Sequence, residues 1–158
     1  GFIPKEGARI MSLQEPSQKM SKSDENPNAT ILMLDSADAI TNKIKRAVTD
    51  SIGIVAYNDE QKGIKNLINI YSTFAGESTE AIVSKYEGKG YGDFKRETAE
   101  VRVEGLRPVR EKDEYLMENK DYLEEIYAKG AAKAHNKARK TLDKVYRKVG
   151  FVQAKRSE

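Results

Sequence analysis

The chain contains no cysteine, which excludes disulfide bonds and metal sites built from thiolates. Its single histidine, His135, excludes a metal site made of several histidines, and we expect no metal ligands among the side chains. No apolar run approaches the ~20 residues that a membrane-spanning helix needs, so we expect no membrane partner. The lack of cysteine is also compatible with a reducing compartment such as the cytosol.

Size and charge limit the class of protein further. A length of 158 residues is that of one ordinary domain, and 38% apolar with 34% charged residues favours a strongly helical protein. The net charge is only +3, but residues 129–158 carry ten Lys and Arg against two acidic residues, whereas the rest carries eighteen against twenty-three. This asymmetry indicates either an anionic partner for the C-terminal end or an amphipathic helix with a solvated, lysine-rich face.

The N-terminal part is predicted to be irregular. Residues 1–34 contain short extended pieces, of which residues 8–11 read as the end of a strand. The apolar, β-rich runs 30–34 and 52–57 are expected to pair with each other. Asp35 is the expected N-cap of a first helix.

From Asp59 onward the chain is predicted to be helical. An apolar stripe ends at Gly76, and Ser78 is expected to cap a shorter helix. The glycine-rich run 87–92 resembles a phosphate loop only superficially, because no strand precedes it and no Gly-Lys-Ser/Thr closes it; a helix end with a turn explains it better. With a last helix over residues 121–149, the fold class is mainly α: a helical bundle with a short irregular or β N-terminal section.

The last predicted helix has two different faces. One is an apolar seam that includes Leu123, Ile126, Leu142, Val145 and Val149. The other carries five cations at steps of four, three, four and three residues, and its members are Lys133, Lys137, Lys140, Lys144 and Arg147. We call these five residues the basic stripe.

The stretch QEPSQKMSKSDENPNA, residues 14–29, is predicted to be an exposed, mobile loop because Pro, Ser, Asn and Asp dominate it. Lys19 and Lys22 can converge as point charges on one polyanion, and Ser21 and Ser23 add hydroxyl donors. Such a set suits phosphate oxygens, above all a triphosphate that gains charge at its leaving group during reaction. The alternative interpretation is a pair of solvated surface lysines.

The residues from Lys19 to Ser23 read KMSKS, and they match without a substitution the signature loop of class I aminoacyl-tRNA synthetases. The wider sequence resembles bacterial tryptophanyl-tRNA synthetases over nearly the whole chain, most weakly over its last 40 residues. The likeness is carried by residues 7–13, 47–51, 66–73 and 86–92. The related tyrosyl enzymes share the loop but not these flanking runs.

The resemblance implies roles for individual residues. In that family the loop closes over ATP, so Lys19 and Lys22 would bind the departing pyrophosphate, with Lys22 in the larger role. The remaining loop residues, Met20, Ser21 and Ser23, would complete the contacts to the nucleotide. The main chain of Ile10 would lie against the adenine, or Ile10 is an ordinary buried strand residue. Magnesium would accompany ATP, although no carboxylate stands out as its ligand.

The resemblance also implies a division of the chain and a set of partners. Residues 1–34 would end a catalytic half, and residues 35–158 would form a helical anticodon-binding domain. The chain would be part of a longer parent protein, a cytoplasmic homodimer that activates L-tryptophan with ATP and transfers it to tRNA(Trp). The family's Rossmann half, with its HIGH-type motif and indole pocket, has no counterpart here, since His135 lacks the required strand–loop–helix setting. The isolated chain is therefore expected to be inactive.

Two other classes of function stay open. One is a free-standing helical RNA-binding module without catalysis, and the other is a structural bundle whose basic face has no ligand. In an RNA-binding role the basic stripe would follow a phosphate backbone. Tyr122, Tyr127 and Tyr146 would then either stack on bases or belong to the core.

Overall fold

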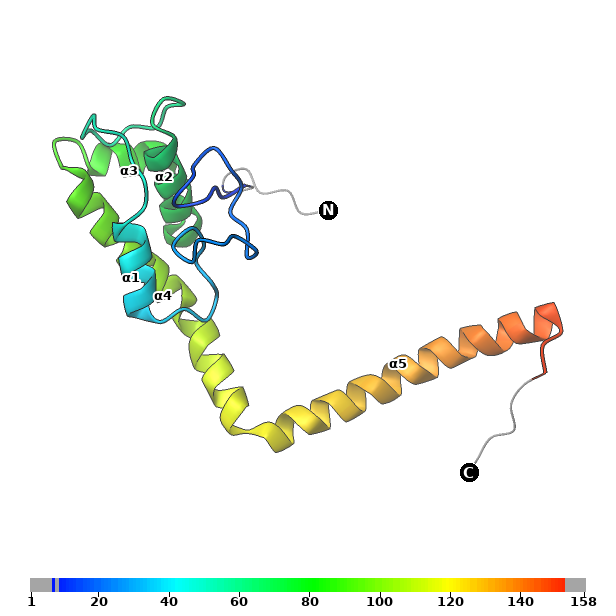
Figure 1. The fold of residues 1–158 in the computed structure, drawn as a ribbon. Coiled ribbons are helices and arrows are strands. Elements are labelled where there is room, and N and C mark those ends of the chain that lie inside the picture. Colours follow the sequence, from blue (N-terminus) through cyan, green and yellow to red (C-terminus); the bar gives the residue numbers. More distant parts are fainter. Residues whose placement is uncertain (1–6, 8, 153–158) are drawn as a thin grey trace. The chain divides into compact units, whose positions relative to one another are not determined.

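A computed structural model describes residue 7 and residues 9–152 of the chain. The chain divides into two compact units, residues 1–111 and residues 112–158. The helices shown in Figure 1 are α1 (Ala37–Lys45), α2 (Lys62–Ala75), α3 (Thr79–Lys85), α4 (Tyr91–Glu118) and α5 (Lys120–Val149). The prediction of a mainly α-helical protein is confirmed.

The first unit is built around an apolar core to which α1, α2, α3 and α4 all contribute. In the predicted apolar stripe of α2, Ile64, Leu67, Ile68 and Tyr71 are buried and Phe74 is half-buried, and α2 packs beside α3. Three aromatic rings meet in this core: Phe94 lies edge-on to Tyr86 at 5.0 Å between ring centroids and stacks with Tyr71 at 6.4 Å. Such rings bury large apolar areas, so this cluster supplies much of the stability of the unit.

Helix ends follow the capping rules, with one correction. Ser78 caps α3 as predicted, because its hydroxyl accepts a hydrogen bond from the amide of Ala81 at 3.3 Å. The prediction that Asp35 caps α1 is wrong: the N-cap is Ser36, whose hydroxyl accepts from the amide of Ala39 at 3.2 Å. The Asp35 carboxylate instead pairs with the ammonium of Lys43 at 2.6 Å, two helical turns further on.

The glycine predictions are confirmed. Gly76 ends α2 in the left-handed conformation at φ 70°, as a C-terminal glycine does. Gly88 has φ 75° in the turn that follows the end of α3 at Lys85, as predicted, but Tyr91 and Gly92 of the run 87–92 already belong to α4.

The expected pairing of residues 30–34 with residues 52–57 is wrong, since neither run forms a strand. Local hydrogen bonds take the backbone groups that a ladder would need. The amide of Leu32 donates to the Asp35 carboxylate at 2.9 Å, and the Leu32 carbonyl accepts from the Asp35 amide at 3.3 Å. Of the apolar side chains that suggested strands, Ile31 and Val55 are buried in the core, and most of the others are exposed, among them Leu32, Met33, Leu34, Ile52 and Ile54.

The second unit contains the long helix α5, whose bounds agree with the prediction to within one residue. Asn119 lies between α4 and α5. The side-chain amide of Asn119 donates a hydrogen bond to the Tyr115 carbonyl in the last turn of α4 at 2.7 Å. Gly150 ends α5 at φ 75°. No residue of α5 is buried. Within the described residues no helix has both the length and the apolar character required to cross a membrane.

Candidate functional site

The loop predicted to bind phosphate begins in a short hairpin, residues 10–20. Met11 faces Lys19 in an isolated antiparallel bridge. One backbone hydrogen bond lies on each side of this pair, from Met20 N–H to the Ile10 carbonyl at 3.1 Å and from Ser12 N–H to the Gln18 carbonyl at 2.9 Å. Lys19 therefore extends from paired backbone rather than from an unsupported loop.

A tight turn closes the hairpin. The amide of Gln18 donates to the carbonyl of Glu15 at 2.9 Å, and Pro16 occupies the second position, where its fixed φ favours a β-turn. The buried hydroxyl of Ser12 accepts from the amides of Gln14 at 3.3 Å and Glu15 at 3.2 Å. The turn before Lys19 is thus closed by hydrogen bonds within residues 12–18.

The KMSKS residues end in a second turn, over residues 21–24. The amide of Asp24 donates to the Ser21 carbonyl at 3.2 Å, and the amide of Ser23 donates to the Ser21 hydroxyl oxygen at 3.2 Å. The hydroxyl of Thr30 donates to the same Ser21 carbonyl at 2.6 Å. Ser21 therefore shapes the turn, and Lys22 lies at its tip. Sequence reasoning missed the contribution of Thr30, which carries no local signal because it lies nine residues away.

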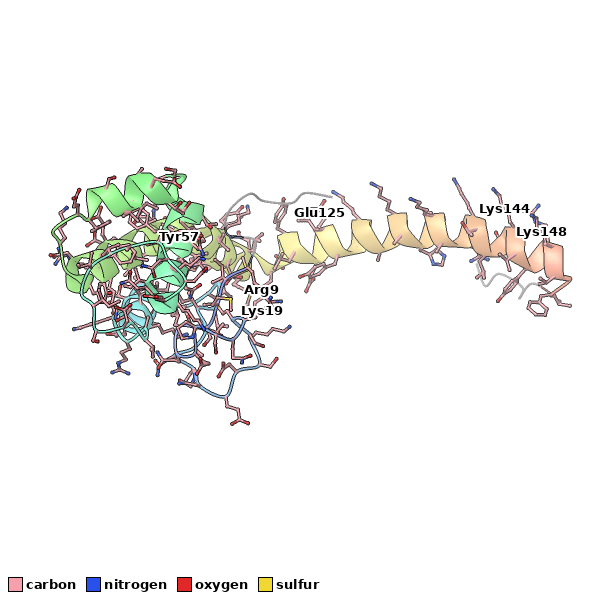
Figure 2. All side chains as sticks on the ribbon, turned by 90° about the horizontal axis from the view of Figure 1, so that it is seen from above. Arg9, Lys19, Tyr57, Glu125, Lys144 and Lys148 are labelled. Carbon is pink, nitrogen blue, oxygen red and sulfur yellow. The ribbon has the colours of Figure 1, made fainter. Side chains whose placement is uncertain are left out.

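The two lysines of the loop are available for a ligand. Both side chains are exposed, and neither takes part in any ion pair found in the described part of the chain. Figure 2 shows Lys19 on the N-terminal segment. Ammonium groups without a counter-ion on one short loop are suited to a multivalent anion such as a chain of phosphates.

Met20 and Ile10 fasten the loop to the first unit. Both are half-buried and pack against the core. A small cavity of about 110 Å³ lies beside them, lined by Ile10, Met20, Ile31, Ile70, Thr73, Phe74 and Arg102. Arg102 lies over the ring of Phe74 at 4.1 Å, and burial lowers the pKa of its guanidinium. Met20 thus anchors the loop, while the predicted contact of the Ile10 main chain with adenine stays a prediction.

The stretch 47–51 is held by a buried polar network. The Tyr91 hydroxyl donates to the Asp50 carboxylate at 2.5 Å and accepts from the side-chain amide of Gln61 at 2.7 Å. Burial acts to raise the pKa of Asp50, but the hydrogen bonds from Tyr91, Ile52 and Gln61 outweigh it and lower that pKa. Burial and the bond to Asp50 raise the pKa of Tyr91. Asp50 is therefore a stable anion that ties this stretch to α4.

The basic stripe is exposed along α5, as predicted for either interpretation of that helix. None of its five cations is in an ion pair with another described residue. From Lys133 to Arg147 the stripe extends over about 21 Å at 1.5 Å per residue. Figure 2 shows Lys144, together with Lys148, projecting from α5.

The tyrosines and the histidine of the second unit are not core residues. Tyr122 and Tyr127 are exposed, so the expectation of a core position is not met for them. Tyr146 is half-buried and its ring lies edge-on to Phe151 at 5.8 Å. His135 is exposed on α5. In the part of the chain that the structure describes, no three His, Asp or Glu side chains are grouped to hold a metal ion.

Known proteins are similar to this chain in sequence. A family model described as tRNA synthetases class I (W and Y) matches residues 1–107. The chain is 56% identical over 152 residues to a tryptophan–tRNA ligase from Clostridium perfringens and 53% identical over 155 residues to one from Bacillus anthracis. These matches cover 96% and 98% of the chain but only 46% and 47% of the relatives. The chain therefore spans less than half the length of these curated relatives.

The fold is also similar to that of a solved structure. A tryptophanyl-tRNA synthetase from Campylobacter jejuni, complexed with ADP and tryptophan, matches with a TM-score of 0.73 and 31% identity. The match covers 91% of this chain and 44% of that one.

Proposed function

Because the chain belongs to the class I tRNA synthetases of the tryptophan and tyrosine type, we propose that it is part of an enzyme that activates L-tryptophan with ATP and transfers it to tRNA(Trp). The observation that carries this proposal is the loop with two exposed lysines, which have no ion-pair partner among the described residues, on a hydrogen-bonded frame. A free-standing RNA-binding module has no need for two lysines and two serines in this order.

In the proposed reaction the carboxylate of tryptophan attacks the α-phosphorus of ATP. A new oxygen–phosphorus bond forms, the bond between the α-phosphorus and the bridging oxygen breaks, and pyrophosphate leaves with the electron pair. Lys19 and Lys22 neutralise the negative charge that builds on this leaving group. Lys22 has the larger role because it lies at the tip of the second turn, whereas Lys19 is held in the hairpin.

Other parts of the proposal rest on the family alone. Magnesium is proposed only as the counter-ion that ATP carries. Among the described residues no cluster of carboxylates could hold it. Residues 1–34 would end the catalytic half and residues 35–158 would serve tRNA binding. The parent would be a cytoplasmic homodimer, and the isolated chain would be inactive because the HIGH-type motif and the indole pocket lie outside it.

The role of Lys22 is tested in a full-length protein that contains this chain. Lys22→Ala is expected to slow tryptophan-dependent pyrophosphate exchange by roughly 10²–10³, the usual loss for one partner of transition-state charge. Tryptophan binding to the free enzyme, measured by calorimetry, should barely change. Lys45→Ala serves as the matched control, since Lys45 is an exposed lysine at the end of α1. An exchange rate for Lys22→Ala close to that of the wild type would rule out the role.

The basic stripe is proposed to contact the phosphate backbone of tRNA. Its support is the exposed row of cations on α5, which form no ion pair within the part of the chain that the structure describes. In the full-length protein, reversing the charges of Lys137 and Lys140 to Glu should weaken tRNA binding and make the salt dependence of log K shallower by about two. The matched control reverses Lys45 and Lys62, two exposed lysines of the first unit. An unchanged affinity for tRNA at low salt would instead support the interpretation of the basic stripe as a solvated helix face.

A further inference from the structure

The backbone of Met11 has polar groups that the hairpin does not use. The two backbone hydrogen bonds that close the Met11–Lys19 pair belong to its neighbours, residues 10 with 20 and residues 12 with 18. Met11 and Lys19 therefore form a non-hydrogen-bonded pair, in which the N–H and C=O of each residue point away from the partner strand. In a larger sheet a further strand would take these groups of Met11.

The side chain of Asn66 takes the place of that further strand. Its amide oxygen accepts from the Met11 N–H at 2.8 Å, and its amide nitrogen donates to the Met11 carbonyl at 2.7 Å. An Asn amide has the same donor and acceptor as a peptide group, so both groups of Met11 are satisfied by one side chain. The two residues are 55 positions apart in the sequence.

Asn66 is held rigidly by the core. It is 2% exposed and lies on α2 between Ile64 and Leu67, both fully buried. Asn is a poor helix former, and a buried amide without partners destabilises a protein, so α2 itself gains nothing from Asn at this position. Its two hydrogen bonds to the hairpin account for its presence.

We propose that Asn66 is a positioning residue for the nucleotide loop, an inference that rests on the proposed function. Its two hydrogen bonds to Met11 fix the backbone opposite Lys19 to the buried face of α2. The next residues are fixed independently, because Leu13 donates to the Ala29 carbonyl at 3.0 Å and accepts from the Val48 amide at 2.7 Å. Asn66 thus supplies the polar contact that, beside the apolar packing of Ile10 and Met20, sets where the paired part of the hairpin, and with it Lys19, lies on the first unit.

The test compares three variants of the full-length protein. Asn66→Leu removes both hydrogen bonds, and Asn66→Asp keeps the size and the acceptor but loses the donor to the Met11 carbonyl. Asn69→Leu is the matched control, because Asn69 lies on the same helix and its side chain accepts a hydrogen bond from the Tyr57 hydroxyl rather than contacting the hairpin backbone. Hydrogen exchange reports on residues 10–20 and on α2 separately, and pyrophosphate exchange reports on activity.

We expect Asn66→Leu to raise hydrogen exchange in residues 10–20 by about tenfold or more while α2 stays protected, because the lost bonds act locally. The kcat of pyrophosphate exchange should fall about 10- to 100-fold with an unchanged dissociation constant for tryptophan, since small misplacements of a catalytic group cost this much. Asn66→Asp should lie between Asn66→Leu and the wild type. If Asn66→Leu also raises the hydrogen exchange of α2, the comparison of the isosteric Asn66→Asp with the wild type decides the test.

Three outcomes overturn the inference. The first is unchanged hydrogen exchange of residues 10–20 in both Asn66 variants, and the second is faster hydrogen exchange with a normal rate of pyrophosphate exchange. The third is an equal loss of pyrophosphate exchange in Asn69→Leu. Failure of the proposed function gives a different pattern. In that case Lys22→Ala leaves pyrophosphate exchange intact, whereas faster hydrogen exchange confined to residues 10–20 in the Asn66 variants still supports the anchoring of the hairpin by Asn66.

Discussion

Both units of the chain contain an amphipathic helix, but the apolar face of that helix is buried in the first unit and not in the second. In the first unit, α2 has an apolar stripe, and most of its stripe residues are buried in the core. In the second unit, α5 has an apolar seam of similar spacing, yet none of its residues is buried. An amphipathic pattern therefore predicts that a helix forms and which face is apolar, but the partners of that face decide whether burial stabilises it.

The sharpest way to test this difference is to remove one phenylalanine from each unit. Phe94 is 0% exposed and contacts two aromatic rings, so Phe94→Ala should lower the free energy of unfolding by about 3–5 kcal/mol. Phe151 is 65% exposed and contacts Tyr146, so Phe151→Ala should cost about 0.5–1 kcal/mol. Urea unfolding of the chain, followed by circular dichroism, measures both values, and equal losses would remove the contrast between the units.

A glycine in each unit gives a test with opposite signs. A Cβ at Gly63 of α2 would lie 2.1 Å from the backbone oxygen of Val48, so Gly63→Ala should destabilise the chain by about 1–3 kcal/mol. A Cβ at Gly130 of α5 meets no atom within 4 Å, so Gly130→Ala should stabilise α5 by about 0.5–1 kcal/mol through helix propensity. Thermal melts followed by circular dichroism report both. A gain in stability from Gly63→Ala would contradict the close approach of α2 to Val48.

Ion pairs should show the smallest contrast. Glu97 pairs with Lys85, and the two side chains are 34% and 37% exposed; Lys85 also donates to the Tyr71 hydroxyl at 2.7 Å. Glu125 of α5 pairs with Lys129 on an exposed face. Glu97→Gln should destabilise the chain by about 1 kcal/mol, and Glu125→Gln by about 0.3–0.5 kcal/mol.

The Glu97 pair also predicts a pH dependence. The hydrogen bond from Lys85 lowers the pKa of Glu97 in the folded state below its ordinary value of 4.5. The stabilisation is therefore fully present above about pH 4.5 and is lost as the pH falls through the lower, folded-state pKa. Stability of the wild type should fall below pH 4.5 more steeply than that of Glu97→Gln. Parallel curves in unfolding experiments at pH 3–7 would argue against this pair as a source of acid sensitivity.

Much of the fold followed from local patterns. The bounds of α5, the stop of α2 at Gly76 and the cap at Ser78 depend on neighbouring residues, so sequence reasoning found them. The prediction failed at residues 30–34, where an apolar run suggested a strand but the Asp35 carboxylate accepts a hydrogen bond from the Leu32 amide instead. That competition between a side chain and a ladder partner is decided by geometry, and composition does not reveal it.

For the candidate site, the residue order alone indicated the proposed phosphate binding: two lysines and two serines in a breaker-rich loop, and a row of cations at helical spacing. Those features are local, because they depend on residue type and on separations of a few positions. Only the tertiary structure decided what holds the loop, since Asn66 and Met11 meet across 55 residues and no short-range pattern connects them. The same holds for the apolar face of α5, whose exposure depends on which segments pack against it and not on the spacing of its own residues.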